Sequence, residues 1–173
     1  GMICLLASAF FCAFVALYVC IFRMPNSVLS LCHKQEHDRA IADCDRAIAI
    51  DPHDAIAYNN RGVAYHKKGQ IDQAMADYDR AIAIDPKNVT AYFNKGMVYG
   101  NAGQFDKAVV EFDKCIANDP KNYSAHFFKA ASCDRLGRKN EAIRGYQAFL
   151  QYAPRQHEKE ISLARQRIEA LGR

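Results

Sequence analysis

The sequence predicts an all-α protein: an α-solenoid of antiparallel helix pairs, preceded by an apolar N-terminal helix. Two observations lead to this prediction. Residues 24–156 repeat with a period of 34 residues, and residues 1–22 contain no charged side chain. A single helix pair cannot bury its apolar face alone, so successive pairs stack on each other and form a solenoid.

Composition excludes several classes of protein. The chain has 173 residues, which is one domain's worth at about 150 residues per domain. Half of the residues are hydrophobic and 24% are charged, a mix that excludes a disordered chain. The seven cysteines are an odd number without a CxxC motif, which argues against a disulfide framework and against a structural zinc site. The net charge of +4 is too small to indicate nucleic-acid binding.

The run of twenty residues at 3–22 is apolar on every side. As a helix it would span roughly 30 Å, the thickness of the hydrocarbon core of a bilayer, so we expect it to anchor the chain in a membrane. Arg23 and Lys34 follow the run, and by the positive-inside tendency they place the repeats in the cytoplasm. Two alternatives remain open. A non-native N-terminus, or a helix buried in a dimer interface, would leave the protein soluble in the cytoplasm.

Each period ends at a proline and carries further columns of similar residues. The sequence DRAIAIDP occurs at both 45–52 and 79–86, and the similar sequence DKCIANDP occurs at 113–120. Short polar side chains precede each first helix and can cap its N–H groups, and glycines follow it, where the chain must reverse through a left-handed backbone. Acidic or amide side chains start the second helix, and the proline ends it. The columns are Asp54, Asn88 and Asn122 for the caps, Gly69, Gly103 and Gly137 for the turns, Asp72, Asp106 and Asn140 for the second starts, and Pro52, Pro86, Pro120 and Pro154 for the ends.

Apolar columns identify the faces that pack. Gly62 lies between two tyrosines of the first helix and is small enough to let the second helix approach closely. On the second helix, Ala74, Tyr78 and Ala81 have the i, i+4, i+7 spacing of one helical face. Three cysteines occupy core columns and are expected to be small buried hydrophobic residues: Cys44, Cys115 and Cys133.

These columns resemble those of the tetratricopeptide repeat (TPR) family, which implies a right-handed α-solenoid. The resemblance divides the chain into an apolar helix at 1–22, a degenerate repeat at 24–54, full repeats at 55–88, 89–122 and 123–156, and a capping helix at 157–173. The degenerate repeat contains Pro25 and lacks the aromatic–glycine pattern in its first helix. The third full repeat also departs, because His126, Ala130 and Cys133 stand where the earlier repeats have Tyr, Gly and Tyr.

In this family the first helices line a concave groove, and the resemblance implies which residues line it here. Asn60 and Asn94 can bond an extended peptide backbone through both donor and acceptor, and the aromatic residues supply apolar contact area. Alternatively, Phe93 and Phe128 could pack between neighbouring repeats, and the two amides could bond the backbone of the adjacent repeat. The expected groove residues are Asn59, Asn60, Val63, Lys67, Phe93, Asn94, Met97, Asn101, Phe127, Phe128 and Arg135.

Some members of the family hold the C-terminal carboxylate of heat-shock chaperones with a clamp of basic residues. The matching positions here hold Asn59, Ser124 and Phe128, none of which is basic. A buried carboxylate would lack its charge-assisted partners at those positions. We therefore expect no clamp of this kind.

Motifs for enzyme chemistry are weak. Residues 33–37 read HKQEH and match the HxxEH zinc-peptidase pattern, but the repeat register places them at a turn between two helices and no third ligand is apparent. The sequence contains no Gly-rich phosphate loop and no Ser/His/Asp constellation that spacing singles out. We therefore expect no catalytic residue, no bound metal and no cofactor.

The sequence thus favours a non-enzymatic interaction scaffold, tethered to a membrane by residues 3–22, that binds a peptide or partner protein in the groove. The alternative is a self-assembling oligomeric scaffold. Residues 35–54 carry six acids and two bases, whereas residues 123–173 carry ten bases and five acids, so opposite ends could associate head to tail. Ordinary surface variation would also explain these charges. The partner stays unnamed, since one fold hosts many functions.

Overall fold

The computed structural model describes the backbone of residues 26–173 and the side chains of residues 35–173. The membrane anchor predicted at 3–22 lies outside the described residues. None of the helices in the described part is both long and apolar enough to cross a bilayer.

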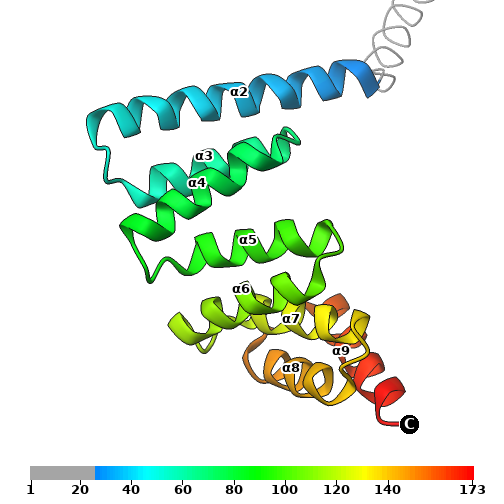
Figure 1. Cartoon of the computed structure of the whole chain (residues 1–173). Coiled ribbons are helices and arrows are strands. Elements are labelled where there is room, and N and C mark those ends of the chain that lie inside the picture. The colour runs from blue at the N-terminus through cyan, green and yellow to red at the C-terminus, as the bar shows by residue number, and fades with distance from the viewer. Residues whose placement is uncertain (1–25) are drawn as a thin grey trace, which may run out of the picture. The chain divides into compact units, whose positions relative to one another are not determined.

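The described residues form eight helices and no strand, which confirms the all-α prediction (Figure 1). They are α2 (Asn26–Ile50), α3 (Ala55–Lys67), α4 (Ile71–Ile84), α5 (Val89–Asn101), α6 (Phe105–Asn118), α7 (Tyr123–Arg135), α8 (Lys139–Tyr152) and α9 (Glu158–Leu171). Residues 40–173 form one compact unit, which contains the end of α2 with α3 to α9. Within that unit α3 pairs with α4, α5 with α6 and α7 with α8, each pair packs on the next, and α9 covers α8.

The three predicted N-caps are confirmed. The Asp54 carboxylate accepts hydrogen bonds from the backbone N–H groups of Ile56 and Ala57, both at 2.9 Å. The Asn88 and Asn122 side chains each accept one from the N–H three residues on, at 2.9 and 3.0 Å. These bonds satisfy donors that the start of a helix leaves free, and losing such a cap typically costs about 1 kcal/mol.

The glycine column makes the reversals between paired helices. Gly69, Gly103 and Gly137 have φ angles of +76°, +72° and +73°, the left-handed region in which a residue with a Cβ is strained. Asp72 and Asp106, the predicted starts of the second helices, lie in the first turns of α4 and α6. There their negative charge is favourable near the positive end of the helix dipole.

The second helices supply the core of each pair. Ala74, Tyr78 and Ala81 of α4 are all 0% exposed. The same columns of α6 and α8 are at most 3% exposed: Ala108, Phe112, Cys115, Ala142, Tyr146 and Phe149. A Cβ on Gly62 would lie 2.7 Å from Cε1 of Tyr78, closer than real Cβ contacts come. Glycine in the first helix therefore lets it touch the aromatic ring of its partner, as predicted.

The third pair reaches the same close approach with the roles exchanged. In α7 the glycine position holds Ala130, which is fully buried. The glycine lies instead on the partner helix, where a Cβ on Gly145 would be 2.8 Å from Cβ of Ala130. At the position of Gly145 the earlier pairs have Asp77 and Glu111. The departure of the third repeat from the pattern is thus compensated on α8.

The first repeat differs from the others. The turn expected at 33–37 is wrong, because α2 continues through these residues as one helix of 25 residues. Gln35 occupies the column of the turn glycines, and a residue with a Cβ disfavours the left-handed backbone. The segment predicted as a degenerate repeat therefore holds one long helix, and its core columns are open: Ala40 is exposed, and Cys44 and Ala47 are half-buried.

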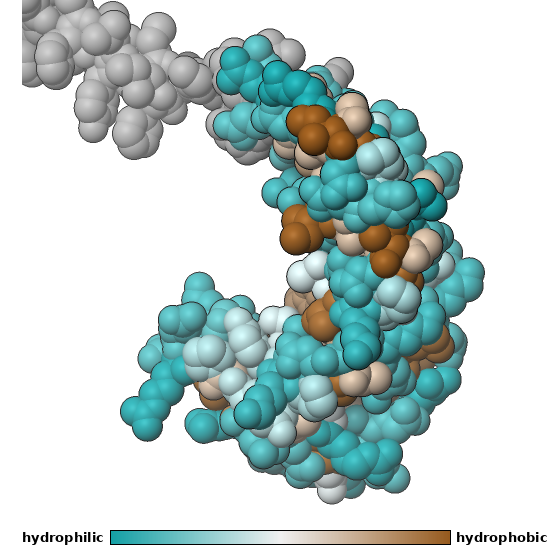
Figure 2. Space-filling view, turned by 90° about the vertical axis from the view of Figure 1, so that its left-hand side faces the viewer, coloured by the Kyte–Doolittle hydropathy of each residue, from teal (hydrophilic) through white to brown (hydrophobic). Residues whose placement is uncertain are grey.

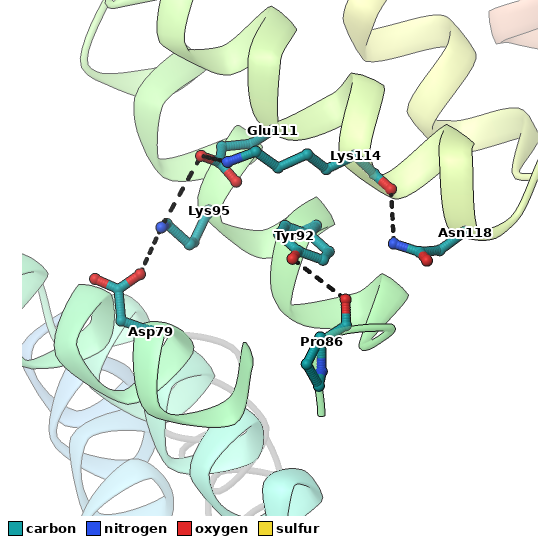
Figure 3. A network of polar contacts seen from close by, with 7 residues as sticks. All are labelled: Asp79, Pro86, Tyr92, Lys95, Glu111, Lys114 and Asn118. Atoms are coloured by element: carbon teal, nitrogen blue, oxygen red, sulfur yellow. Dashed lines mark hydrogen bonds and ion pairs between the residues drawn. The ribbon is translucent and has the colours of Figure 1, made fainter. Parts of the chain in front are cut away.

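Ion pairs join successive repeats at one recurring position. Asp45–Arg61 (2.6 Å), Asp79–Lys95 (2.5 Å) and Asp113–Lys129 (2.5 Å) each link a second helix to the following first helix. Lys95 lies between Asp79 and Glu111 (Figure 3), 4.0 Å from the Glu111 carboxylate. Burial alone would lower the pKa of Lys95, but the two acids raise it. Lys95 therefore stays charged between the pairs and ties them together.

Candidate functional site

A pocket of about 610 Å³ opens between the first helices α5 and α7 and the capping helix α9. Figure 2 shows that the repeats are hollowed on one side, with hydrophobic residues (brown) set among polar ones. Of the predicted groove residues, Met97, Asn101, Phe128 and Arg135 line this pocket. Its full lining is Gly96, Met97, Gly100, Asn101, Phe105, Phe112, Phe128, Ala131, Ser132, Asp134, Arg135, Tyr146 and Arg167.

Small residues create this space. Gly100 occupies the position of His66 in the previous repeat, and Ala131 occupies that of Met97. A Cβ on Gly100 would have no atom within 4 Å, so the missing side chain leaves open volume. Because a large side chain is absent at both positions, the ring of Phe128 forms an apolar wall of the pocket.

Charged groups from α7 and α9 also line the pocket. Nε and Nη2 of Arg167 donate to the two carboxylate oxygens of Asp134, both at 2.7 Å, and this hydrogen bonding raises the pKa of Arg167. The Arg135 guanidinium lies 5.1 Å from the centre of the Phe105 ring, a cation–π contact. Burial raises the pKa of Tyr146 to about 12, so its phenol is neutral near pH 7.

Sequence reasoning missed Arg167 as a groove residue, because α9 was treated only as a cover for the last repeat. One signal was present in the sequence. The same column holds Tyr65, Tyr99 and Cys133 in the three repeats, none of which is a basic residue. A cation in that column of the cap indicates a role other than packing.

A second pocket, of about 270 Å³, lies nearer the starts of the first helices. It includes the predicted residues Asn59, Phe93 and Asn94, together with Val89, Thr90, Asn122 and Ser124. Asn94 Nδ2 donates to Asn59 Oδ1 at 3.0 Å, and Asn59 Nδ2 donates to Asn60 Oδ1 at 3.5 Å. The alternative that Asn94 bonds backbone of the adjacent repeat is therefore wrong, because its partner is a side chain. Asn59 is only 7% exposed and serves mainly to hold Asn94.

The predicted groove aromatics divide into two kinds. Phe93 and Phe128 lie edge to face with 5.8 Å between ring centres. Both are half-buried and pack against the core around Phe112, yet each also lines a pocket. Phe127 instead contacts Phe149, at 4.9 Å between ring centres, and Tyr146. The structure therefore places Phe127 in the packing of α7 on α8, outside the lining of both pockets.

The remaining predicted groove residues lie on α3 and are not part of the lining of either pocket. Asn60 and Lys67 are exposed, and Val63 is half-buried against the core around Tyr78. The two pockets described above therefore draw most of their lining from α5 and α7, and only Asn59 from α3.

Three cysteines lie among the residues whose side chains the structure describes, and all three are free thiols. Cys115 and Cys133 are fully buried, as predicted. The same prediction is wrong for Cys44, which is only half-buried because the core face of α2 is not covered. Burial raises the pKa of Cys115 to about 12 and also raises that of Cys133, so both thiols are protonated at neutral pH. In the part of the chain that the structure describes, no group of three or more His, Cys, Asp and Glu side chains is arranged to hold a metal ion.

Comparison with known structures finds the same architecture. A crystal structure of MamA has 26% sequence identity and a TM-score of 0.61, over 67% of this chain and 63% of that chain. YrrB, described as a TPR protein with an unusual peptide-binding site, has 22% identity and a TM-score of 0.66, over 74% and 63%. The first TPR of Spaghetti (RPAP3), bound to the HSP90 peptide SRMEEVD, has 24% identity and a TM-score of 0.62, over 69% and 94%. The chain thus spans less than two thirds of the MamA and YrrB chains.

Comparison with curated proteins gives no match. Family models described as TPR repeat match residues 29–69 and 64–103, and one described as Tetratricopeptide repeat matches residues 89–122. These matches cover more than half of the chain and agree with the stacked helix pairs. The chain therefore belongs to the tetratricopeptide repeat family.

Proposed function

We propose that this protein is a non-enzymatic adaptor that binds an extended peptide segment of a partner protein along α5 and α7. The observation that carries the proposal is the pocket of about 610 Å³ on the face of the first helices, which is lined by both apolar and charged side chains. Pockets of this size and mixed lining are typical of ligand sites. The peptide-binding site described for YrrB and the peptide bound by RPAP3 support the same use of the fold.

The amide groups beside the second pocket suit the backbone of such a peptide. Asn94 is held by its bond to Asn59, and an amide offers both a donor and an acceptor to an extended chain. Replacing Asn94 by Ala should weaken binding of a groove peptide about tenfold, since it removes hydrogen bonds while leaving the cores of the pairs untouched. Peptides for the measurement come from selecting a random peptide library on the full chain in nanodiscs. If no selected peptide is sensitive to groove substitutions, groove binding is ruled out.

We propose further that residues 3–22 tether the adaptor to a membrane, with the repeats in the cytoplasm. The support is the uncharged run itself, since a tether raises the local concentration of the groove at the bilayer. Carbonate extraction of membranes from cells that express the full chain should leave it in the pellet. Phe14→Lys with Val15→Lys should release it, because charge at the centre of a span is costly. Release of the unaltered chain would contradict the tether.

A second candidate function, self-assembly, is favoured by the open core columns of α2. Ala40 is exposed, whereas Ala74 in the same column is 0% exposed. The occupant we propose is a second copy of this chain, since residues 35–54 are acidic and residues 123–173 are basic. Light scattering of the full chain in detergent should then give a mass above the monomer. Ala40→Lys with Ala47→Lys should lower it, because the two added cations repel the basic end of the second copy. A monomeric mass for the unaltered chain would exclude this function.

A further inference from the structure

We infer that the pocket between α5, α7 and α9 selects one kind of peptide: a segment in which an acidic residue neighbours a large apolar residue. This inference rests on the groove binding proposed above and adds the chemistry of the ligand. It makes Arg135 and Arg167 the contacts of the ligand carboxylate, and Gly100 the residue that makes room for the apolar side chain.

The charge of the lining favours an anion. The lining contains two arginines and one acid. Both carboxylate oxygens of Asp134 are already bonded to Nε and Nη2 of Arg167, and Arg167 also hydrogen-bonds to Tyr146, so Asp134 has no oxygen left to neutralise Arg135. Arg135 is exposed, and among the described residues no carboxylate lies within ion-pair distance of it. A carboxylate from the ligand is the partner that this unbalanced charge would bind most strongly.

The geometry of Arg135 is suited to that role. Its guanidinium lies over the Phe105 ring, and stacking on an aromatic face orients the planar group. Arg167 is likewise held in place by its two bonds to Asp134. Because both cations are oriented before a ligand arrives, less side-chain entropy is lost when the ligand binds.

The apolar part of the pocket explains the second requirement. Met97 and Phe128 present hydrophobic surface, and the glycine at 100 and alanine at 131 leave the volume in front of them empty. The volume of about 610 Å³ is within the range of pockets that enclose drug-sized ligands, so it can hold two neighbouring side chains. A large apolar side chain would fill the space beside the carboxylate.

The other pocket does not share this preference. Its lining of Asn, Thr, Ser, Val and Phe contains no charged residue. Selection for an acidic residue is therefore expected at the α9 end of the groove only, with amide contacts to the peptide backbone at the other end.

The test is a random peptide library selected on the full chain in nanodiscs, followed by Kd measurement on the enriched peptides by fluorescence anisotropy. We expect enrichment of Asp or Glu next to Leu, Ile, Met, Phe or Tyr, and weaker binding as salt increases. Changing the acidic residue to its amide should weaken binding about tenfold. Capping the peptide C-terminus as an amide should change the affinity less than about twofold, because the contact is to a side-chain carboxylate and needs no free terminus.

Two protein variants separate the two requirements. Gly100→Leu fills the pocket and should weaken binding more than about tenfold, with an unchanged or higher melting temperature, because Leu favours the helix more than Gly does. Its control is Ala117→Leu, exposed on α6 and outside the lining. Arg135→Gln should weaken binding of the acidic peptide about tenfold and reduce its salt dependence, the remainder coming from Arg167. Its control, Arg144→Gln, loses the same charge outside the pocket and should have no effect.

The outcomes distinguish this inference from the function on which it rests. Enriched peptides that bind through Asn94 but show no acidic preference would overturn the inference and leave the adaptor function intact. Acidic peptides whose affinity is unchanged by Gly100→Leu would also overturn it. The absence of any enriched peptide would count against the adaptor function itself.

Discussion

Residues 45–52 and 79–86 have the same sequence, DRAIAIDP, in two different surroundings. In α4 the segment is packed between α3 and α5, and Ala81 is 0% exposed. In α2 the matching Ala47 is half-buried, and Ile50 is 86% exposed. The same sequence thus forms the end of a helix in both places, but its first alanine is fully buried only where neighbouring helices cover it. Most helical stability in proteins comes from such packing and little from propensity.

The largest expected difference between the two segments is in local stability. Backbone amides at 81–84 should exchange with solvent only through global unfolding, whereas those at 47–50 should exchange through local opening. We expect opening free energies that differ by at least about 2 kcal/mol, measured by native-state hydrogen exchange. Because the sequences match, intrinsic exchange rates cancel in the comparison. Equal protection of both segments would mean that α2 is covered in solution.

The same substitution should have unequal effects in the two contexts. Ala81→Leu forces a larger side chain into a filled core and should lower the free energy of unfolding by about 1–3 kcal/mol. Ala47→Leu, on the open helix, should change it by less than about 0.5 kcal/mol. Urea unfolding followed by circular dichroism measures both. A large effect of Ala47→Leu would contradict the open face described for α2.

A third difference between the two helices is in how stability depends on pH. The repeat position that holds Cys44 in α2 holds Tyr78 in α4, where it is buried. Burial raises the pKa of Tyr78 from 10.0 to about 12, so the folded state favours the neutral phenol. This contribution to stability is complete below pH 10 and is lost as pH rises from 10 to about 12. Tyr78→Phe should therefore reduce the alkaline loss of stability by about 1–2 kcal/mol.

The same variant has a useful control at neutral pH. The Tyr78 hydroxyl is buried and makes no hydrogen bond within the described part of the chain. Its removal should therefore leave stability at pH 7 unchanged or slightly higher. Urea midpoints at pH 7 and pH 11 for both proteins test this. A variant that is destabilised equally at both pH values would show that the phenol has a partner in solution.

The smallest expected effect concerns the missing turn. Gln35→Gly restores the residue that the other repeats have at the reversal and should weaken α2 at that point by about 1 kcal/mol. Carbon chemical shifts of residues 31–39 should lose helical character while the urea midpoint stays the same. Gly69→Ala is the reverse change and should strain the turn at φ +76°. Unaltered helical shifts in Gln35→Gly would show that more than the glycine is missing.

Much of the fold was predictable because the residue types at the caps, turns and close contacts of each repeat indicate its local structure. Asp54 accepts the hydrogen bonds of a cap, Gly69 has the left-handed turn, and Gly62 allows contact with Tyr78. The exchange of glycine between α7 and α8 was not predictable, because Ala130 becomes acceptable only when Gly145 faces it. Whether Ala130 fits therefore depends on the residue at a second position, which lies on a different helix.

The candidate site was predictable in part. Family positions led to Met97, Asn101, Phe128 and Arg135, which line one pocket. They misplaced Phe127, since the resemblance assigns a side chain to a face but not to one of two neighbours on that face. They could not indicate Arg167, because its contact with Asp134 depends on how the last helix packs on the third repeat.

The sequence by itself determined which segments become helices, where most of them start and reverse, and that they repeat every 34 residues, because caps, turns and helical periodicity depend on residues close together in the chain. Only the tertiary structure decided that the core columns of α2 are exposed or half-buried, that a pocket lies between α5, α7 and α9, and that Arg167 of α9 lines this pocket. These features depend on which side chains contact each other across helices. The unfilled volume and the unpaired charge at such contacts are set by the packing of the folded chain.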